Sequence, residues 1–132
     1  DVEIVMLFFD TSAWVEYFIG SPKGLEIKKL IESERREVST PTIVLVELSC
    51  KAYKENINFD RQLDFIKQNS IILNLNEDVI IRVGKIYAEM KKMNKKASLA
   101  DAIIATMAAI NNASVVTCDS DFKGLDNIKL IS

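Results

Sequence analysis

The sequence predicts an α/β fold in one domain, with a central, mostly parallel sheet of about five strands and helices on both faces. Short apolar, β-like runs alternate with segments of helical periodicity along the chain, which is typical of parallel strands joined by crossovers. No repeat or low-complexity tract interrupts this alternation. At 132 residues, with 48% hydrophobic and 27% charged residues, the chain can bury one core.

The first predicted elements are a strand and two helices. Residues 3–9 (EIVMLFF) are a continuous apolar run, as expected for a strand buried on both faces. Residues 12–20 (SAWVEYFIG) fit a short helix that ends at Gly20. Residues 21–33 predict a second helix, because serine and proline at its start suit the cap and the first helical position. Its apolar face is expected to contain Leu25, Leu30 and Ile31.

The middle of the chain adds a polar strand and two more helices. Residues 36–40 (REVST) predict the strand. Thr40 and Pro41 then open a helix over 41–55, and 59–68 (FDRQLDFIKQ) predicts another helix. Proline suits a helix start because the N–H groups of the first turn have no partners within the helix.

The last part of the chain continues the alternation. Residues 70–75 (SIILNL) predict a strand, and 76–93 predict an amphipathic helix that ends in lysines. Residues 98–112 (SLADAIIATMAAINN) are almost entirely apolar and predict a buried helix. Residues 113–118 (ASVVTC) predict a strand, and 128–132 predict a weak final one.

The composition excludes several classes of enzyme. The chain has no histidine, so imidazole acid–base catalysis, histidine-activated nucleophiles and histidine-ligated zinc are all excluded. Cys50 and Cys118 match no metal-binding spacing and are expected as free thiols. The apolar run at 3–9 is too short to span a bilayer and lacks basic flanks, so we expect a cytoplasmic protein. Residues 1–5, which precede Met6, are interpreted as an upstream extension or a cloning remnant.

Two of the predicted strands end directly in carboxylates. Residues 3–9 lead into Asp10, and 113–118 lead into Asp119, with Asp121 two residues further on. Ligands of a parallel sheet bind beyond the carboxyl ends of its strands, so these acids are candidates for a functional site. Each also has a structural interpretation, because aspartate is favoured as a helix N-cap and in turns.

Two further acids lie on apolar faces of predicted helices. Glu47 interrupts the run TIVLVEL, and its structural alternative is a pair with Lys51 one turn later. Such a pair contributes only about 0.2–0.5 kcal/mol, less than the cost of burying an unpaired acid. Asp101, three residues after Ser98, fits a capping box at the start of its helix and also faces inward.

The four acids predict a site for a hard cation. If Asp10, Glu47, Asp101 and Asp119 converge, their mutual repulsion raises their pKa values unless a cation is present. Carboxylates without thiolate or imidazole favour Mg²⁺ or Mn²⁺ over zinc. Ions held in this way typically act on phosphate esters, so these residues are our catalytic candidates.

The charge of the chain does not by itself indicate a nucleic-acid binder, since the net value is −2. Setting the four candidate acids aside changes this charge to +2. A lysine cluster before the Asp101 helix could hold the phosphates of RNA, although lysines at a helix C-terminus also complement the helix dipole. The cluster consists of Lys91, Lys92, Lys95 and Lys96.

The four acidic segments resemble the motifs of PIN-domain nucleases. LFFDTSAW resembles the first motif, with Asp10, and TPTIVLVEL resembles the second, with Glu47. SLADAIIATMAA resembles the third, with Asp101, and VVTCDSDF resembles the fourth, with Asp119. The motifs occur in the expected order and cover essentially the whole chain, so residues 1–132 are identified as one PIN-like domain.

A lone domain of this length most resembles the toxin of VapBC-type toxin–antitoxin pairs. The resemblance implies an Mg²⁺- or Mn²⁺-dependent endoribonuclease that forms a homodimer and is blocked by a cognate antitoxin. It implies in-line attack of a metal-bound water on a phosphodiester, which leaves a 5′-phosphate and a 3′-hydroxyl. The implied metal ligands are Asp10, Asp101 and Asp119, with Glu47 as a further catalytic acid. The implied supporting residues are Ser12, Thr117 and Asp121, the last also an alternative ligand to Asp119.

Other functions fit the residues less well or stay open. A receiver domain needs an adjacent acidic pair near its first strand and a dehalogenase-type phosphatase needs Asp-x-Asp, whereas this chain has Asp10 followed by threonine and serine. A housekeeping PIN nuclease of RNA processing or decay and a catalytically silent PIN-like scaffold are the open alternatives. Thermal stabilisation by metal separates nuclease from scaffold, and a neighbouring antitoxin gene separates toxin from housekeeping enzyme.

Overall fold

The computed structural model describes residues 3–122 and 125–132, except for the side chain of Asp121. Its strands form one sheet in the order β3-β2-β1-β4-β5, and every neighbouring pair is parallel. The strands are β1 (Val5–Phe9), β2 (Arg36–Pro41), β3 (Ile71–Leu73), β4 (Ser114–Thr117) and β5 (Ile128–Leu130). The helices are α1 (Thr11–Ile19), α2 (Pro22–Glu32), α3 (Thr42–Glu55), α4 (Phe59–Asn69), α5 (Glu77–Met93) and α6 (Leu99–Ile110), with a 3-10 turn η1 (Ser120–Phe122).

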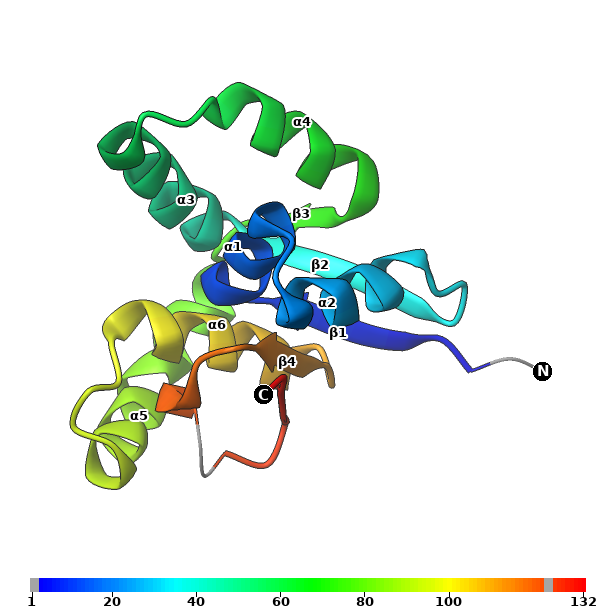
Figure 1. The fold of residues 1–132 in the computed structure, drawn as a ribbon. Helices are drawn as coiled ribbons and strands as arrows, with labels where there is room; N and C mark the ends of the chain where they lie inside the picture. Colours follow the sequence, from blue (N-terminus) through cyan, green and yellow to red (C-terminus); the bar gives the residue numbers. More distant parts are fainter. Residues whose placement is uncertain (1–2, 123–124) are drawn as a thin grey trace.

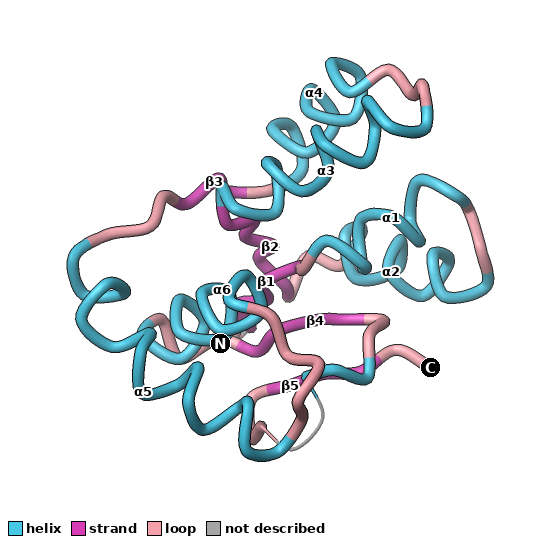
Figure 2. The backbone as a smooth tube through the Cα atoms, turned by 90° about the vertical axis from the view of Figure 1, so that its left-hand side faces the viewer, coloured by secondary structure: helices cyan, strands magenta, loops and turns pink. Residues whose placement is uncertain are grey.

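The helices cover both faces of the sheet, which confirms the predicted α/β fold. Figure 2 shows α5 and α6 on one side of the sheet and α1 and α2 on the other. The α3–α4 pair lies above β3 at the top of Figure 1, and α3 also contacts α1 and β2. No helix in the described part of the chain is both long enough and apolar enough to cross a bilayer.

The strand order places a topological switch point between β1 and β4. From β1 the chain adds β2 and β3 on one side, and it then crosses back to add β4 and β5 on the other. Crossovers that leave in opposite directions open a crevice at the carboxyl ends of the two central strands. These strands pair from Leu7 with Ser114 to Phe9 with Val116, so both end at the same level. Any site built on this crevice uses the residues that follow Phe9 and Thr117.

The core lies on both faces of the two central strands and is dominated by aromatic and branched side chains. Trp14 is fully buried against Phe9, with their ring centroids 5.1 Å apart, as expected for a core residue on the first helix. Tyr17 and Phe18 continue this cluster and pack on Phe65 of α4. The aromatic cluster therefore connects α1 to the α3–α4 pair.

The buried face of α2 differs from the predicted one. Ile27 is fully buried, whereas Leu25 is 56% exposed, and Leu30 is buried as expected. Gly24 sets this rotation, because a Cβ atom there would lie 2.1 Å from the carbonyl oxygen of Glu16 on α1. The close approach of the two helices turns Gly24, Ile27 and Leu30 inward and leaves Leu25 outside.

The start of α3 also differs in detail from the prediction. Pro41 is the N-cap, and Thr40 belongs to β2 rather than to the helix start. The Thr40 hydroxyl accepts a hydrogen bond from Trp14 Nε1 at 3.1 Å and lies 2.9 Å from Ser70 Oγ. Ser70 Oγ donates to the Ile66 carbonyl, so Thr40 is the donor to Ser70. This buried chain of hydrogen bonds links α1, β2 and α4.

Candidate active site

Asp10 lies at the centre of the candidate site, where β1 ends and α1 begins. Its backbone N–H donates to the Val116 carbonyl of β4, so the residue bridges the switch point. Its Oδ1 atom caps α1 by accepting the Ala13 N–H at 2.9 Å. The prediction of an N-cap is therefore confirmed. The side chain is only 4% exposed, although an N-cap on a helix surface is ordinarily in contact with water.

Two neighbouring hydroxyl groups, whose oxygen atoms are 3.2 Å apart, hold the two oxygens of the Asp10 carboxylate. Ser12 Oγ donates to Oδ1 at 2.7 Å, and Thr117 Oγ1 donates to Oδ2 at 2.5 Å. Both hydroxyls also accept backbone N–H groups, Ser12 from Cys118 and Thr117 from Asp119, each at 2.9 Å. The network therefore joins the start of α1 to the segment after β4 and sets the backbone position of Asp119.

Burial raises the pKa of Asp10 from 3.8 to about 6. Desolvation is the main cause, and it outweighs the hydrogen bonds from Thr117, Ala13 and Ser12, which favour the charged form. The negative charge of Asp101 adds to the rise, which shows that α6 brings this second acid within electrostatic reach. A cation beside Asp10 would offset both the desolvation and the repulsion.

Asp101 occupies the third position of α6 and forms the predicted capping box. Ser98 Oγ accepts the Asp101 N–H at 3.1 Å, and the Asp101 carboxylate accepts the Ser98 N–H at 3.0 Å. The side chain is half-buried rather than solvated. Asp101 thus caps its helix and also acts electrostatically on Asp10.

Glu47 lies in the second turn of α3 and contacts α1. Its Oε1 atom accepts the Thr11 hydroxyl at 2.6 Å. Lys51, the structural partner considered from the sequence, instead pairs with Glu55 at 2.9 Å. Thr11 is the site residue that sequence reasoning missed, and its only signal was a hydroxyl directly after Asp10.

The remaining fourth-motif residues lie beyond β4. Asp119 follows Cys118 and is half-buried, whereas Asp121 belongs to η1 and its side chain lies outside the described part of the chain. Within that described part, no group of three aspartate, glutamate, cysteine or histidine side chains is close enough to hold a metal ion. Asp10 and Asp119 follow β1 and β4, and Asp101 lies in the first turn of α6. Their carboxylate oxygens are the kind of ligand that a hard cation prefers.

Cys118 does not contribute a thiolate to this site. Its side chain is half-buried rather than fully buried, and its pKa is raised to about 11 by desolvation and by the charge of Asp10. A thiol with this pKa stays protonated at neutral pH. Its backbone N–H, which donates to Ser12, is the part that supports the site.

The four lysines of the predicted cluster are all exposed. Lys91 and Lys92 lie in the last turn of α5, as the helix-dipole interpretation requires. Lys91 Nζ donates to the Lys95 carbonyl at 2.6 Å and lies 5.8 Å from the centroid of the Tyr87 ring. Lys91 therefore has a structural role in closing the turn between α5 and α6, while the others extend into solvent.

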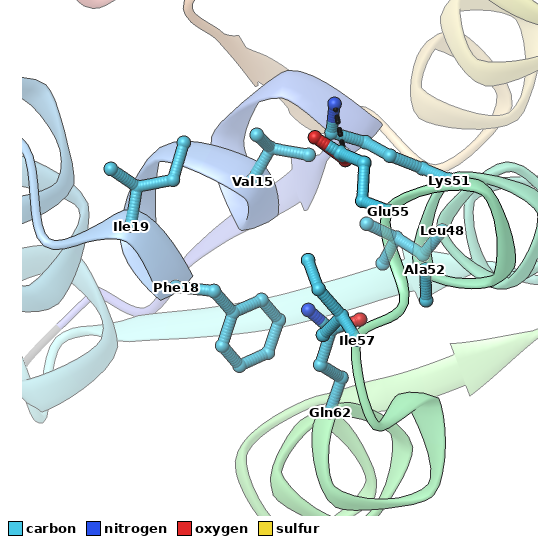
Figure 3. Close-up of a pocket in the computed structure, with 9 residues that line it drawn as sticks. All are labelled: Val15, Phe18, Ile19, Leu48, Lys51, Ala52, Glu55, Ile57 and Gln62. Atoms are coloured by element: carbon cyan, nitrogen blue, oxygen red, sulfur yellow. Dashed lines mark ion pairs between the residues drawn. The ribbon is translucent and has the colours of Figure 1, made fainter.

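An apolar pocket of about 150 Å³ lies between α1 and the α3–α4 pair (Figure 3). Phe18 faces Ile57 and Gln62 across it, and the Lys51–Glu55 ion pair lies on its rim. The Oε1 atom of Gln62 is buried and has no hydrogen-bond donor among the described residues. The pocket can take an apolar side chain and offers one buried acceptor to whatever occupies it.

The comparisons with known proteins agree with this architecture. The model of the PIN domain family matches residues 7–128. Ribonuclease VapC11 from Mycobacterium tuberculosis is 28% identical over 121 residues, which are 89% of each chain.

Two solved structures share the fold across almost their whole length. One is a toxin–antitoxin complex from Klebsiella pneumoniae, with a TM-score of 0.76 and 21% identity over 96% of this chain and 98% of that one. The other is VapBC2 from Rickettsia felis bound to a DNA fragment from its promoter, with a TM-score of 0.73 and 21% identity over 96% and 97%.

Proposed function

This chain belongs to the PIN domain family, and from that premise we propose that it is a metal-dependent endoribonuclease, the toxin of a VapBC-type pair. The observation that carries the proposal is Asp10, a desolvated carboxylate at the switch point between β1 and β4. The described contacts of Asp10 come from neutral hydroxyl and amide groups, and its acidic neighbour Asp101 adds negative charge. Such a carboxylate is costly to bury unless a cation binds to it.

The donor set fits Mg²⁺ or Mn²⁺. The acids that would hold the ion are Asp10, Asp101 and Asp119, which lie after β1, at the start of α6 and after β4. Their oxygen atoms are the ligands that these hard cations prefer. When bound, the ion would neutralise charge on the scissile phosphate and acidify a bound water.

The protein groups around the acids prepare the hydrolysis of the RNA backbone. Ser12 and Thr117 hold the Asp10 carboxylate in one orientation. Glu47 accepts a proton from the attacking water while the oxygen of that water bonds to phosphorus. The bond from phosphorus to the 3′ oxygen breaks, and that oxygen takes up a proton from a solvent water molecule, which leaves a 3′-hydroxyl and a 5′-phosphate. We propose that the exposed Lys92, Lys95 and Lys96 hold phosphates of the RNA strand.

Cleavage of single-stranded RNA with Mn²⁺ or with a chelator tests this function. We expect cleavage only with the metal, and its loss in an Asp119→Asn variant. Asp121→Asn should retain activity if Asp119 is the fourth-motif ligand, and the opposite result would assign the ligand to Asp121. Asp126→Asn is the matched control, because Asp126 is an exposed acid that precedes β5 at the other end of the sheet. Cleavage that persists in the chelator would contradict the proposal.

A catalytically silent scaffold predicts a different outcome. A prepared acidic site gains thermal stability from millimolar Mn²⁺, by an amount that follows the ratio of metal concentration to Kd. We expect the wild-type protein to gain stability and the Asp119→Asn variant to gain less. Absence of both cleavage and stabilisation would favour the scaffold over the nuclease.

We propose the cognate antitoxin as the partner of the apolar pocket. Two solved structures that share the fold are a toxin–antitoxin complex and VapBC2 bound to a DNA fragment. In this chain, α1 and α3 line the pocket and also carry Thr11 and Glu47, so a segment bound there contacts the same two helices. The Oε1 atom of Gln62, which has no donor among the described residues, would accept an N–H group from that segment.

The probe for that surface is the product of any small gene found next to the gene for this chain, and the absence of such a gene would count against the toxin assignment. Ile57→Asp places a charge in the pocket and should weaken its binding by roughly 10-fold or more, with RNA cleavage unchanged. Ile80→Asp, on the exposed face of α5, is the control and should bind like the wild type. Equal binding by both variants would exclude the pocket as the docking surface.

The homodimer, which the toxin resemblance implies, and the cytoplasmic location, which the short apolar run at 3–9 favours, are also part of this proposal. Sedimentation of the purified chain at micromolar concentration measures the first. A monomer at that concentration would contradict the dimer without affecting the nuclease assignment.

A further inference from the structure

Thr11 makes a contact that is separate from the network around Asp10. It is the first residue of α1, and its hydroxyl donates to Glu47 Oε1 of α3 at 2.6 Å, across 36 positions of sequence. The next residue, Ser12, donates to Asp10 instead. Two adjacent hydroxyl groups at the start of α1 therefore donate hydrogen bonds to two different acids.

Among the described residues, Glu47 has no cationic partner that would neutralise its charge. It accepts the Thr11 hydroxyl, while Lys51 is engaged with Glu55. A hydroxyl orients a carboxylate but leaves its negative charge in place, whereas a lysine would offset it. The contact therefore orients the Glu47 carboxylate without adding an ion pair to it.

The contact also divides the two oxygens of Glu47 between two tasks. Oε1 is held by Thr11, whereas no described group donates to Oε2. Glutamate has several rotatable bonds, and one short hydrogen bond across helices removes much of that freedom. One oxygen is thereby anchored, and the other stays available to a water molecule.

We propose that Thr11 is a positioning residue that orients Glu47 for proton transfer. This inference rests on the proposed nuclease function, because it gives Glu47 its task there. The Thr11 hydroxyl is engaged with Glu47, so its loss should lower kcat and leave KM for RNA unchanged. Groups that orient such acids typically change activity or metal affinity by about 10–100-fold.

The test is a double-mutant cycle between Thr11→Val and Glu47→Gln, read by RNA cleavage and by calorimetric titration with Mn²⁺. Thr11→Val keeps the shape of the side chain and removes the donor, and Thr11→Ser restores the hydroxyl. Thr42→Val is the matched control, because Thr42 is likewise the first residue of its helix. Melting temperatures check that each variant is folded.

We expect Thr11→Val to lower kcat or Mn²⁺ affinity by about 10-fold or more in the wild-type background and by less than about twofold in Glu47→Gln. Thr11→Ser should recover most of the loss, and Thr42→Val should show none. Equal losses in both backgrounds, or an unaffected Thr11→Val, would overturn the inference while the nuclease stands. A wild-type protein that neither cleaves RNA nor binds Mn²⁺ would instead overturn the proposed function.

Discussion

The starts of α1 and α6 each carry an aspartate that caps a helix, but the two acids lie in different surroundings. Asp10 is the N-cap of α1 and accepts the Ala13 N–H, while Asp101 is the third residue of α6 and shares a capping box with Ser98. Asp10 is almost completely buried and also accepts two hydroxyl groups. Asp101 keeps part of its surface exposed.

The comparison shows that capping a helix and holding a buried charge place different requirements on a carboxylate. A cap needs only an oxygen within reach of backbone N–H groups, and water can solvate the rest of the side chain. Burial destabilises the charged carboxylate by more than the hydrogen bonds stabilise it, as the raised pKa of Asp10 indicates. We therefore expect charge removal to affect function at both positions, and to affect stability mainly at Asp10.

The largest expected effect is the loss of activity in Asp10→Asn. Asparagine keeps an oxygen for the Ala13 N–H and has nearly the same volume, but it lacks the charge that a cation requires. We expect RNA cleavage with Mn²⁺ to fall roughly 1,000-fold, which corresponds to several kcal/mol of lost stabilisation of the transition state. Cleavage within about threefold of the wild-type rate would reduce Asp10 to a capping residue.

The second effect concerns the pH dependence of stability in chelator. The pKa of Asp10 is about 6 in the folded chain against 3.8 for an unperturbed group. Its contribution to the free energy of unfolding is therefore complete below pH 3.8 and is lost as the pH rises through about 6. Asp10→Asn should match the wild type near pH 3.5 and exceed its stability by up to about 3 kcal/mol at pH 7. Urea unfolding at both pH values measures this, and a gap that does not change with pH would refute it.

The third effect separates the two roles of Asp101. Asp101→Asn should lower cleavage about 100-fold, because the site loses a charge, and should change stability by less than about 1 kcal/mol. Ser98→Ala should do the reverse, because it removes the cap at a cost of about 1 kcal/mol and leaves the carboxylate in place. The two roles are not separable if both variants lose stability together and cleave RNA equally well.

The smallest expected effect concerns the lysine cluster, in which Lys91 has a structural role and the other lysines are proposed to bind RNA. Lys91→Ala should lower the melting temperature slightly, because it removes the bond to the Lys95 carbonyl. Lys92→Ala and Lys96→Ala should leave stability unchanged and reduce the salt dependence of RNA binding, by a slope of about 0.7 for each phosphate that is no longer neutralised. Unchanged salt dependence in both would assign these lysines to solubility alone.

Local patterns were sufficient to predict the strands and helices. The caps at Ser21 and Ser98 and the C-cap at Gly20 lie where the sequence predicts them. The errors fall where two elements meet. Leu25 was predicted to be buried but is exposed, because Gly24 brings α2 against α1, a contact that the periodicity of one helix cannot reveal.

The candidate site shows the same limit. The acids were predictable because each interrupts an apolar pattern or ends a strand, and burying an acid there is costly without a purpose. Their hydrogen-bond partners were not predictable in full. Thr11 reaches a glutamate 36 positions away, and Lys51 pairs with Glu55 rather than Glu47, although both glutamates are one helical turn away from it.

The sequence by itself determined the α/β alternation, the absence of imidazole chemistry and the acids that end a strand or interrupt an apolar helix face. These properties depend on residue type and on spacing along one element, and both can be read from the amino-acid sequence. Only the tertiary structure decided which acid is desolvated, which hydroxyl holds which carboxylate and where an apolar pocket opens. Those properties depend on how elements distant in sequence are packed together, because water is excluded by neighbours that no local pattern specifies.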